Sequence, residues 1–163
     1  MAEEEEMGQL ALVLGDFHIP LRCAEVPPKY KEMITPNKVN AVFCTGNIGS
    51  REIYDWCKSL SPVLHTVAGD FEDTAIAEFP SQKVFEFCGV KIGIIHGHQI
   101  IPWGDEEALE NKAKEMGVKL LMHGHSHVMK TSQSNGVYFL NPGSMTGAYS
   151  SLKVNPVPSF MIL

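Results

Sequence analysis

The chain has 163 residues, of which 44% are hydrophobic, and this size and composition predict a single domain with a core of its own. The 13 Lys and Arg residues against 19 Asp and Glu residues give a formal net charge of −6. Proteins that bind a phosphate backbone need a concentrated positive face, so this charge argues against a nucleic-acid partner.

An acidic run, Glu3 to Glu6, opens the chain. Like charges so close together repel each other and stay hydrated, which predicts a disordered tail over residues 1–8 and one domain over residues 9–163. There is no basic and apolar leader, and no apolar run approaches the roughly 20 residues that span a bilayer. We therefore expect a soluble protein that is not inserted into membranes and reaches them only through partners.

The four cysteines are widely spaced and include no Cys-x-x-Cys pair: Cys23, Cys44, Cys57 and Cys88. This spacing favours neither a zinc knuckle nor a redox motif. The simplest interpretation is small buried thiols in a reducing cytosol.

In the first half of the chain, predicted strands alternate with predicted helices. We expect a strand over 10–14, a helix opened by Pro27 and Pro28 and ending near Ile34, a strand over 39–45, a helix capped by Ser50 and ending near Leu60, and a strand over 63–67.

The second half contains two predicted hairpins. Strands 83–87 and 90–95 flank Cys88-Gly89, Asp105 caps a helix that Gly117 ends, and a strand follows over 118–122. A second hairpin joins 128–133 to 137–140, and 160–163 is a last apolar run. Alternating strands and helices followed by hairpins predict a mixed α/β layered fold.

Six of the seven histidines lie in three small groups: His18 beside Asp16, His96 with His98, and His123 with His125 and His127. Five polar residues follow predicted strand ends within about three positions, where loops of α/β sheets converge on one crevice: Asp16, Asn47, Asp70, His96 and His125. Their oxygen and imidazole ligands suit divalent ions of the Mn, Zn or Fe class, and the pattern predicts a two-metal site.

Two local features strengthen this interpretation. Residues 124–127 alternate Gly, His, Ser and His, so in an extended segment His125 and His127 point to the same side. Flanking glycines let the backbone turn sharply beside an ion: Gly15, Gly46, Gly69 and Gly124.

Together these motifs resemble, in order and spacing, the signature series of the calcineurin-like metallophosphoesterases: Asp16-x-His18, Gly46-Asn47, Gly69-Asp70-Phe71-Glu72, His96-Gly97-His98, Gly124-His125-Ser126-His127 and Asn141-Pro142-Gly143-Ser144. The resemblance covers the chain from about Leu10 to its end. It implies a layered α-β-β-α sandwich of two mixed sheets flanked by helices. It also implies up to two Mn or Zn ions on a set of seven ligands: Asp16, His18, Asn47, Asp70, His96, His125 and His127.

The chain departs from the active enzymes of this family at three positions, and at one of them Asp70 stands where they carry a metal-binding amide. Asn47 stands where they carry an Asp that bridges the metals, and an uncharged amide compensates less of the charge of two dications. Phe71 stands where they carry the His that protonates the leaving group, and a phenyl ring cannot donate a proton. We therefore expect weak metal binding, no catalytic residue and no enzymatic activity.

Two other histidines have open roles. By the resemblance His98 lies beside the pocket without binding metal, where it would orient a neighbour or a substrate phosphate. His123 is expected to pack under the sheet, which is the commoner role of a buried histidine.

Within the family, residues 14–20, 44–47, 95–105 and 141–149 resemble the small subunit of retromer, an endosomal sorting coat. The resemblance implies a cytoplasmic, metal-binding scaffold subunit that is peripheral on endosomal membranes. It would act in endosome-to-Golgi retrograde transport of membrane proteins by docking onto the large helical-solenoid subunit.

Two surfaces are candidates for protein contacts. The loop Ile100, Ile101, Pro102 and Trp103 offers aliphatic and aromatic anchors beside the crevice, with at least one isoleucine suited to the core instead. Tyr149 and Leu152, with 154–158, are predicted to form a second surface away from the crevice that receives hydrophobic motifs of regulators, or equally to cover their own core.

Two alternatives remain open: a Mn- or Zn-dependent phosphodiesterase with weak residual activity, and a divalent-metal-binding protein without a coat partner. The resembling proteins continue past residue 160 with about one further hairpin. We therefore expect an exposed strand edge near Leu163.

Overall fold

The structure is a computed structural model that describes residues 8–72 and 76–163, so the predicted acidic tail, apart from Gly8, lies outside the described residues. The first sheet contains, in spatial order, β3 (Leu64–Thr66), β2 (Ala41–Cys44), β1 (Ala11–Leu14) and β9 (Met161–Ile162). The second contains β4 (Gln82–Phe87), β5 (Val90–Ile95), β6 (Leu120–Met122), β8 (Val137–Asn141) and β7 (Lys130–Ser134).

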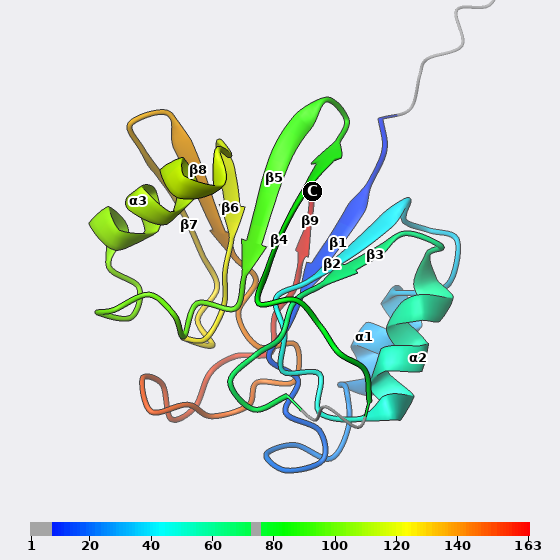
Figure 1. Ribbon diagram of the computed structural model, residues 1–163. Coiled ribbons are helices and arrows are strands. Elements are labelled where there is room, and N and C mark those ends of the chain that lie inside the picture. Colours follow the sequence, from blue (N-terminus) through cyan, green and yellow to red (C-terminus); the bar gives the residue numbers. More distant parts are fainter. Residues whose placement is uncertain (1–7, 73–75) are drawn as a thin grey trace, which may run out of the picture.

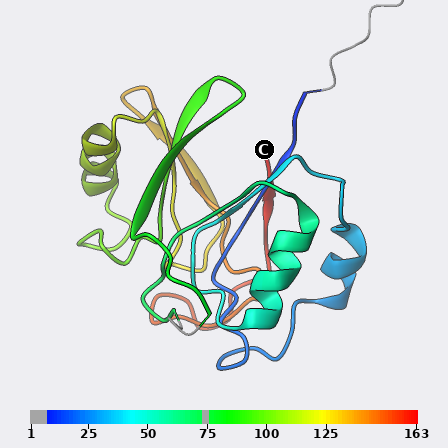
Figure 2. The same cartoon turned by 45° about the vertical axis from the view of Figure 1, so that its right-hand side comes forward.

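The two sheets face each other, and helices cover their outer faces. Helices α1 (Pro28–Met33) and α2 (Arg51–Leu60) lie against the first sheet, and α3 (Glu106–Met116) lies against the second (Figures 1 and 2). This arrangement confirms the predicted α-β-β-α sandwich. Among the residues described, no helix has the length and apolar character needed to cross a bilayer.

The helix ends follow the predicted signals. The Ser50 side chain accepts a hydrogen bond from Ile53 N (3.3 Å), and the Asp105 side chain accepts one from Ala108 N (2.9 Å). Gly117 ends α3 with a φ of 69°, a conformation that costs glycine little.

Both hairpins turn through two residues of positive φ, which match the twist of the flanking strands: Cys88, Gly89, Asn135 and Gly136. The second turn is one residue shorter than predicted because Ser134 pairs with Val137 and extends β7.

Both sheets are mixed, and their parallel strands set the position of the loops. In the first sheet β1, β2 and β3 run parallel, and in the second β5, β6 and β8 do. Figure 1 shows the loops that follow these strands gathering at one end of the sandwich, opposite the β4–β5 hairpin. The fold therefore brings residues from distant parts of the chain together at that end.

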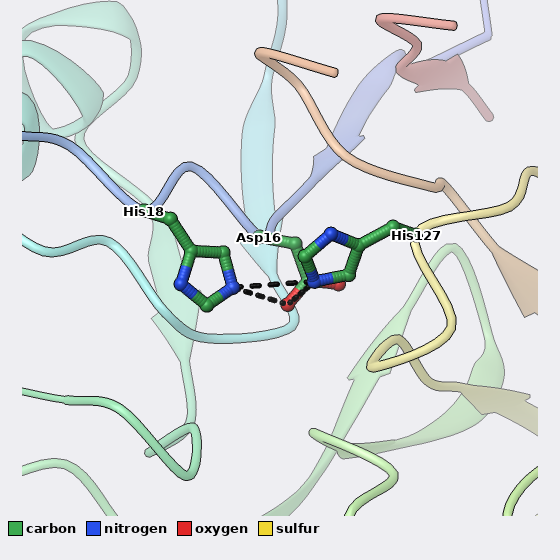
Figure 3. A group of neighbouring side chains, drawn as sticks. All are labelled: Asp16, His18 and His127. Atoms are coloured by element: carbon green, nitrogen blue, oxygen red, sulfur yellow. Dashed lines mark hydrogen bonds and ion pairs between the residues drawn. The ribbon is translucent and has the colours of Figure 1, made fainter. Parts of the chain in front are cut away.

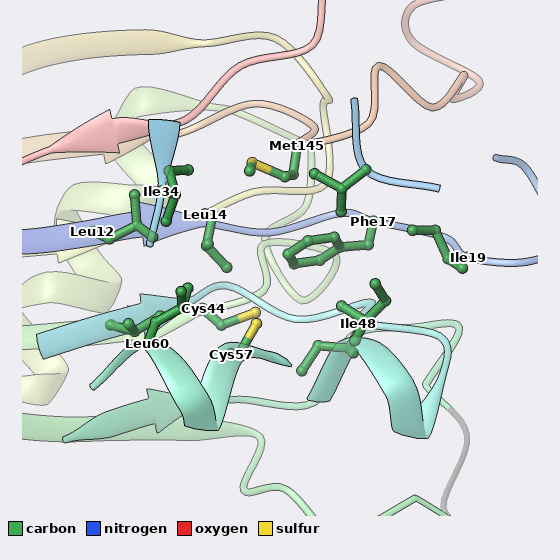
Figure 4. Packing of buried hydrophobic residues seen from close by; sticks show 13 residues of the cluster. Leu12, Leu14, Phe17, Ile19, Ile34, Cys44, Ile48, Cys57, Leu60 and Met145 are labelled. Carbon is green, nitrogen blue, oxygen red and sulfur yellow. The ribbon is translucent and has the colours of Figure 1, made fainter. Parts of the chain in front are cut away.

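The apolar runs of the first sheet are buried on both faces. Leu12 and Leu14 belong to the cluster beneath α1 and α2, which Figure 4 shows from close by. Ala11 and Val13, on the opposite face of β1, belong to a cluster that joins the two sheets around Phe43. This double burial explains why the strand reads as a continuous apolar run, and each large aliphatic side chain buried here stabilises the fold by about 1.5–3 kcal/mol.

The cysteines agree only in part with the expectation of buried thiols. Cys44 and Cys57 are fully buried in the cluster beneath α2, and burial raises the pKa of Cys44 to about 12, so its thiol stays neutral. Cys23 is half-buried. Cys88 is exposed because it occupies the hairpin turn.

Candidate metal centre

Six of the seven predicted ligands form two neighbouring groups at the loop end of the sandwich. One group is Asp16, His18 and His127, and the other is Asp70, His96 and His125, each with ligand atoms within 4.8 Å of one another. The residues come from loops after β1, β3, β5 and β6, as the positions of the strand ends predicted. Asn47, in the loop after β2, contacts both groups.

In the first group, both imidazoles face the Asp16 carboxylate. His18 Nε2 lies 3.8 Å and His127 Nε2 3.6 Å from Asp16 Oδ1, and the two nitrogens lie 3.2 Å from each other (Figure 3). Asp16 is fully buried and both histidines are almost so.

The second group is built around Asp70. Its Oδ1 lies 3.1 Å from His96 Nε2, and its Oδ2 lies 3.5 Å from His125 Nδ1. His96 Nε2 is also 3.5 Å from Asp16 Oδ1, so the two groups adjoin through His96.

The Asn47 side chain lies between the two groups of predicted ligands. Its Nδ2 lies 2.8 Å from Asp70 Oδ1, 3.4 Å from Asp16 Oδ1 and 3.0 Å from His96 Nε2. Its Oδ1 faces the other way and accepts a hydrogen bond from Phe71 N (3.0 Å). Ligation of a metal through this oxygen would therefore require the amide to turn over and release the Phe71 backbone.

Backbone carbonyls fix the orientation of two ligand histidines. His96 Nδ1 donates to Thr45 O (2.8 Å), and His127 Nδ1 donates to Ala148 O. A neutral imidazole whose Nδ1 carries the proton presents the lone pair of Nε2, which here faces the cluster in both cases.

The donor set fits divalent cations. Two nitrogens bound to one tetrahedral zinc lie about 3.3 Å apart, close to the 3.2 Å between His18 Nε2 and His127 Nε2. Two carboxylate oxygens and two imidazole nitrogens lie within 3.4 Å of the Asn47 amide nitrogen, which has only two protons. Oxygen and imidazole ligands in this number suit Mn or Zn.

Burial and neighbouring groups shift the pKa values of the two carboxyls in opposite directions. Burial is the largest influence on Asp16 and Asp70 and would raise their pKa values. The charge of His96 and the hydrogen bonds of neighbouring side chains outweigh it, so both pKa values are lowered and both carboxyls stay ionised.

Burial and neighbouring carboxylates also have opposite effects on the pKa values of the histidines, and which effect is larger differs from one histidine to the next. Burial would lower the pKa of His96, but Asp16 and Asp70 raise it overall. For His125 and His127, burial dominates and lowers the pKa, which keeps these imidazoles neutral near pH 7, as metal ligands must be.

The backbone of the centre is unusual. Five of the seven predicted ligands have positive φ without being glycine: Asp16, His18, Asn47, His125 and His127. This conformation costs an ordinary residue on the order of 1 kcal/mol. The predicted extended geometry of residues 124–127 is therefore wrong: left-handed turns at His125 and His127, and not strand alternation, direct their imidazoles into the two groups.

The flanking glycines serve a different purpose from the one predicted. Gly46 alone of the four has positive φ, 111°. A Cβ at Gly15 would collide with Thr45, one at Gly69 with Asn47, and one at Gly124 would lie 2.8 Å from Asp16 Oδ2. Close packing of the ligand loops, and not turning, is what excludes a side chain at these three positions.

Sequence reasoning missed the residues that hold the loops. Glu72 accepts hydrogen bonds from Asn47 N (2.8 Å), Ile48 N (3.0 Å) and Gly69 N (3.2 Å). Ser144 Oγ donates to Asp16 O (2.7 Å). Glu72 and Ser144 both lie in the family motifs found in the sequence. Their hydrogen-bond partners lie in other loops, which come close only in the folded chain.

The other histidines lie outside the two groups. His123 is buried, as expected, and burial lowers its pKa to about 4. The His98 ring lies 5.3 Å from the His96 ring, and its buried Nδ1 has no hydrogen-bond partner among the described residues. His65 stacks on Phe85 with ring centroids 3.9 Å apart.

The loop with the predicted partner-binding residues is only partly exposed. Ile100 is 5% exposed and packs in the cluster beneath α3, so it is a core residue. Ile101 is 80% and Trp103 47% exposed, and Pro102 is exposed as well. Trp103 contacts the centre directly, with its ring 4.4 Å from that of His125.

The second predicted surface adjoins the metal centre, contrary to the expectation that it lies away from it. Tyr149 O accepts a hydrogen bond from Arg22, which lines the cavity over the two groups. Leu152 lines a neighbouring cavity together with Trp103 and His125. The chain returns here because Ser144 and Thr146 bond the loop after β1. Tyr149 and Leu152 are 55% and 50% exposed.

The family model of the calcineurin-like phosphoesterase superfamily domain matches residues 10–163, and the chain belongs to this superfamily. Vacuolar protein sorting-associated protein 29 (Vps29) of Schizosaccharomyces pombe is 34% identical over 158 residues, covering 94% of this chain and 83% of that protein. Within the superfamily the chain therefore belongs to the Vps29 family.

Solved structures of Vps29 proteins are also similar to this chain. Vps29 of Entamoeba histolytica complexed with zinc has 45% identity and a TM-score of 0.88, covering 94% of this chain and 84% of that one. Vps29 of Chaetomium thermophilum complexed with a cyclic peptide has 33% identity and a TM-score of 0.80, covering 96% and 80%.

The Glu72 contacts predict a structural role that can be measured. Glu72→Ala leaves the N–H groups of Asn47, Ile48 and Gly69 without their acceptor, and we expect the free energy of unfolding to fall by about 1.5–3 kcal/mol. Glu72→Gln keeps one acceptor oxygen and should lose less. Urea denaturation followed by circular dichroism measures both, and an alanine variant as stable as the wild type would contradict the role.

Proposed function

We propose that this chain is a non-catalytic, metal-binding scaffold subunit of the retromer coat. It acts in endosome-to-Golgi retrograde transport of membrane proteins, in the cytoplasm and peripherally on endosomes. Its membership of the Vps29 family supports the coat assignment. The observation that carries the non-catalytic role is the phenyl ring of Phe71 in the wall of the metal cavity.

The cavity over the two groups has a volume of about 250 Å³, and none of the described residues that line it is suited to act as the acid. It is lined by His18, Arg22, Asn47, Asp70, Phe71, Trp103, His125, His127, Ser150 and Ser151. The three histidines belong to the predicted ligand set, and His98 is not part of the lining. By the resemblance, Phe71 stands at the position of the acid, and its ring is 57% exposed and edge-on to that of His18. A leaving group would therefore depart unprotonated, and the loss of general acid catalysis would lower the rate of hydrolysis by about 10²–10⁴-fold.

Asn47 supports the same conclusion. Three carboxylates at this distance would repel one another unless metals separated them. The amide instead donates to Asp70 Oδ1 and approaches Asp16 Oδ1, so it links the two acids. The centre can thus keep its shape with few metals or none, as a docking scaffold requires.

We propose that Asp16, His18 and His127 hold one divalent cation and Asp70, His96 and His125 a second, with Asn47 between them. The solved structure of Entamoeba histolytica Vps29 complexed with zinc supports such binding. A bound cation would supply Lewis-acid charge to the cavity. The chain's own residues fix the ligands: Thr45 O and Ala148 O orient His96 and His127.

The docking surface combines the exposed side chains of Ile101, Pro102 and Trp103. Trp103 Nε1 donates to His98 O (3.2 Å) while its ring covers His125, so the indole is held in place before a partner arrives. Ordered, exposed Trp and Ile side chains are the kind of anchor that dominates binding energy. We propose that the large helical-solenoid subunit docks here and that regulators use the adjoining Tyr149 and Leu152 surface.

Replacing the anchor should abolish docking. Ile101→Asp places a charge in the centre of the proposed interface, and we expect affinity for the large solenoid subunit to fall at least about thirtyfold. Calorimetry with the purified subunit measures the loss. The control is Val90→Asp, which adds the same charge on the hairpin at the opposite end of the sandwich (Figure 1). Equal binding by Ile101→Asp and wild type would refute the assigned interface and leave a metal-binding protein without this partner.

Each group should account for one cation. We expect His127→Ala and His96→Ala each to remove one of two Zn or Mn sites, because each takes away one of three ligands. Elemental analysis after dialysis against metal measures the stoichiometry. His65→Gln is the control because His65 stacks on Phe85, outside the groups. Unchanged stoichiometry in both alanine variants would exclude these ligand sets.

Restoring the two family residues should restore turnover. We expect no hydrolysis of an activated phosphodiester by the Mn-loaded wild type, and measurable hydrolysis by Phe71→His with Asn47→Asp, since a general acid contributes about 10²–10⁴-fold. A spectrophotometric assay measures both. Turnover by the wild type that His96→Ala abolishes would instead favour the alternative, a weak Mn- or Zn-dependent phosphodiesterase.

A further inference from the structure

Strand β3 lies at the edge of the first sheet, beside α2, and one side of its backbone faces away from the sheet (Figure 1). Val67 N donates to Cys44 O in β2, and Val63 O accepts a hydrogen bond from β2 as well. Because the direction of the backbone groups alternates along a strand, Leu64 and Thr66 turn theirs toward the open edge.

Only one position along this edge is paired among the described residues. Ala68, two residues after Thr66, directs its N–H outward to Pro80 O (2.8 Å). The outward N–H and C=O groups of Leu64 and Thr66 form no hydrogen bond with any residue that the structure describes. An unpaired strand edge is a template for pairing with another chain.

A groove with a volume of about 490 Å³ runs along the open edge. It is lined by side chains of α2, of β3, of the segment before β4 and of β4 itself, among them Tyr54, Lys58, Leu64, Thr66, Phe79 and Lys83. The rings of Tyr54 and Phe79 meet edge-on at 5.3 Å and form an apolar wall. Thr66 is 8% exposed, and its Oγ1 has no hydrogen-bond partner among the described residues. The groove therefore offers unpaired polar groups beside an apolar wall.

The groove has one lysine on each side of the strand edge. Lys58 belongs to α2, which covers the outer face of the first sheet. Lys83 belongs to β4, and Phe85, on the same face of β4, stacks on His65 of β3 with ring centroids 3.9 Å apart. Lys83 therefore lies on the inner side of β3. Glu78 is the one acidic residue in the described lining, so the positive charges outnumber it.

Neither lysine has a carboxylate to itself among the described residues. Lys58 shares Asp55 Oδ1 with Arg51, at 3.3 Å and 3.2 Å. Lys83 forms no ion pair within the part of the chain that the structure describes. Burial and the charge of Lys83 together lower the pKa of His65, so this charge acts on β3. The groove is thus complementary to acidic side chains.

We propose that β3 receives an extended acidic segment of a partner protein as an added strand. The backbone of the segment pairs with Leu64 and Thr66 and supplies affinity. Neighbouring side chains of a strand point to opposite faces, so two consecutive acidic residues reach Lys58 on one side and Lys83 on the other. The lysines thereby select acidic sequences. The site uses none of the predicted metal ligands and lies outside the two docking surfaces proposed above.

Titration of a synthetic peptide into the isotope-labelled full chain tests the site by NMR. The probe is the acetylated and amidated peptide Thr-Val-Thr-Glu-Glu-Val-Thr-Val. We expect the amide signals of Leu64 and Thr66 to shift and their hydrogen exchange to slow, because the peptide accepts from these N–H groups. The same peptide with Gln-Gln in place of Glu-Glu should bind about tenfold more weakly, because both ion pairs are lost.

Two further comparisons separate charge from backbone pairing. Lys58→Gln combined with Lys83→Gln should bind the Glu-Glu peptide about as weakly as the wild type binds the Gln-Gln peptide. Lys91→Gln, which removes an exposed lysine outside the groove lining, should bind as the wild type does. Of two peptides N-methylated at alternating positions, the one whose methyl groups face β3 should lose binding and the other should retain it.

Four results would overturn the inference. They are unchanged Leu64 and Thr66 amides at about 1 mM peptide, equal binding of both N-methylated peptides and the parent, equal binding of the Gln-Gln and Glu-Glu peptides, and protection of the two amides that rises with protein concentration when no peptide is present. The last result would assign the edge to a second copy of the chain. Signals outside the groove report whether the lysine variants keep their fold.

Discussion

The centre depends on one fully buried carboxylate, that of Asp16. Its Oδ1 faces His18, His96 and His127, and its Oδ2 accepts a hydrogen bond from His125 N (3.0 Å). A buried charge is tolerated only when donors or cations around it compensate it, so the loops after β1, β5 and β6 must close around this group. The left-handed turns in these loops, each unfavourable alone, are maintained by that requirement.

Two of the departures from the family's active enzymes, Asn47 and Phe71, lie at this centre. Asn47 adds hydrogen bonds where the family's enzymes add charge, and Phe71 adds an apolar face where they add a proton donor. The Phe71 ring makes contacts of its own: it packs against His18 and beneath the Arg22 guanidinium. Phe71 therefore contributes to the wall of the cavity.

The structure also joins surfaces that the sequence treats as separate. Trp103 covers His125, Tyr149 covers Arg22, and Leu152 lines a cavity next to both. The metal groups, the apolar loop and the segment after residue 148 therefore form one continuous face. A partner bound to this face would contact the rim of the cavity, so occupancy of the centre and docking share residues.

The sequence by itself determined the elements, the sandwich and the set of candidate ligands. Caps such as Ser50 and Asp105, the turn at Cys88 and Gly89, and apolar runs such as that of β1 act over a few residues and can be read locally. The family motifs placed the candidate ligands for the same reason, since each follows a strand end.

Only the tertiary structure decided how these pieces meet. It divided six of the seven candidate ligands into two groups, turned the Asn47 amide nitrogen inward, buried Ile100 and brought Arg22 between Phe71 and Tyr149. These contacts join residues that are tens to more than one hundred positions apart. Their geometry depends on how two sheets pack and on backbone conformations at non-glycine residues, which no local pattern of residue types specifies.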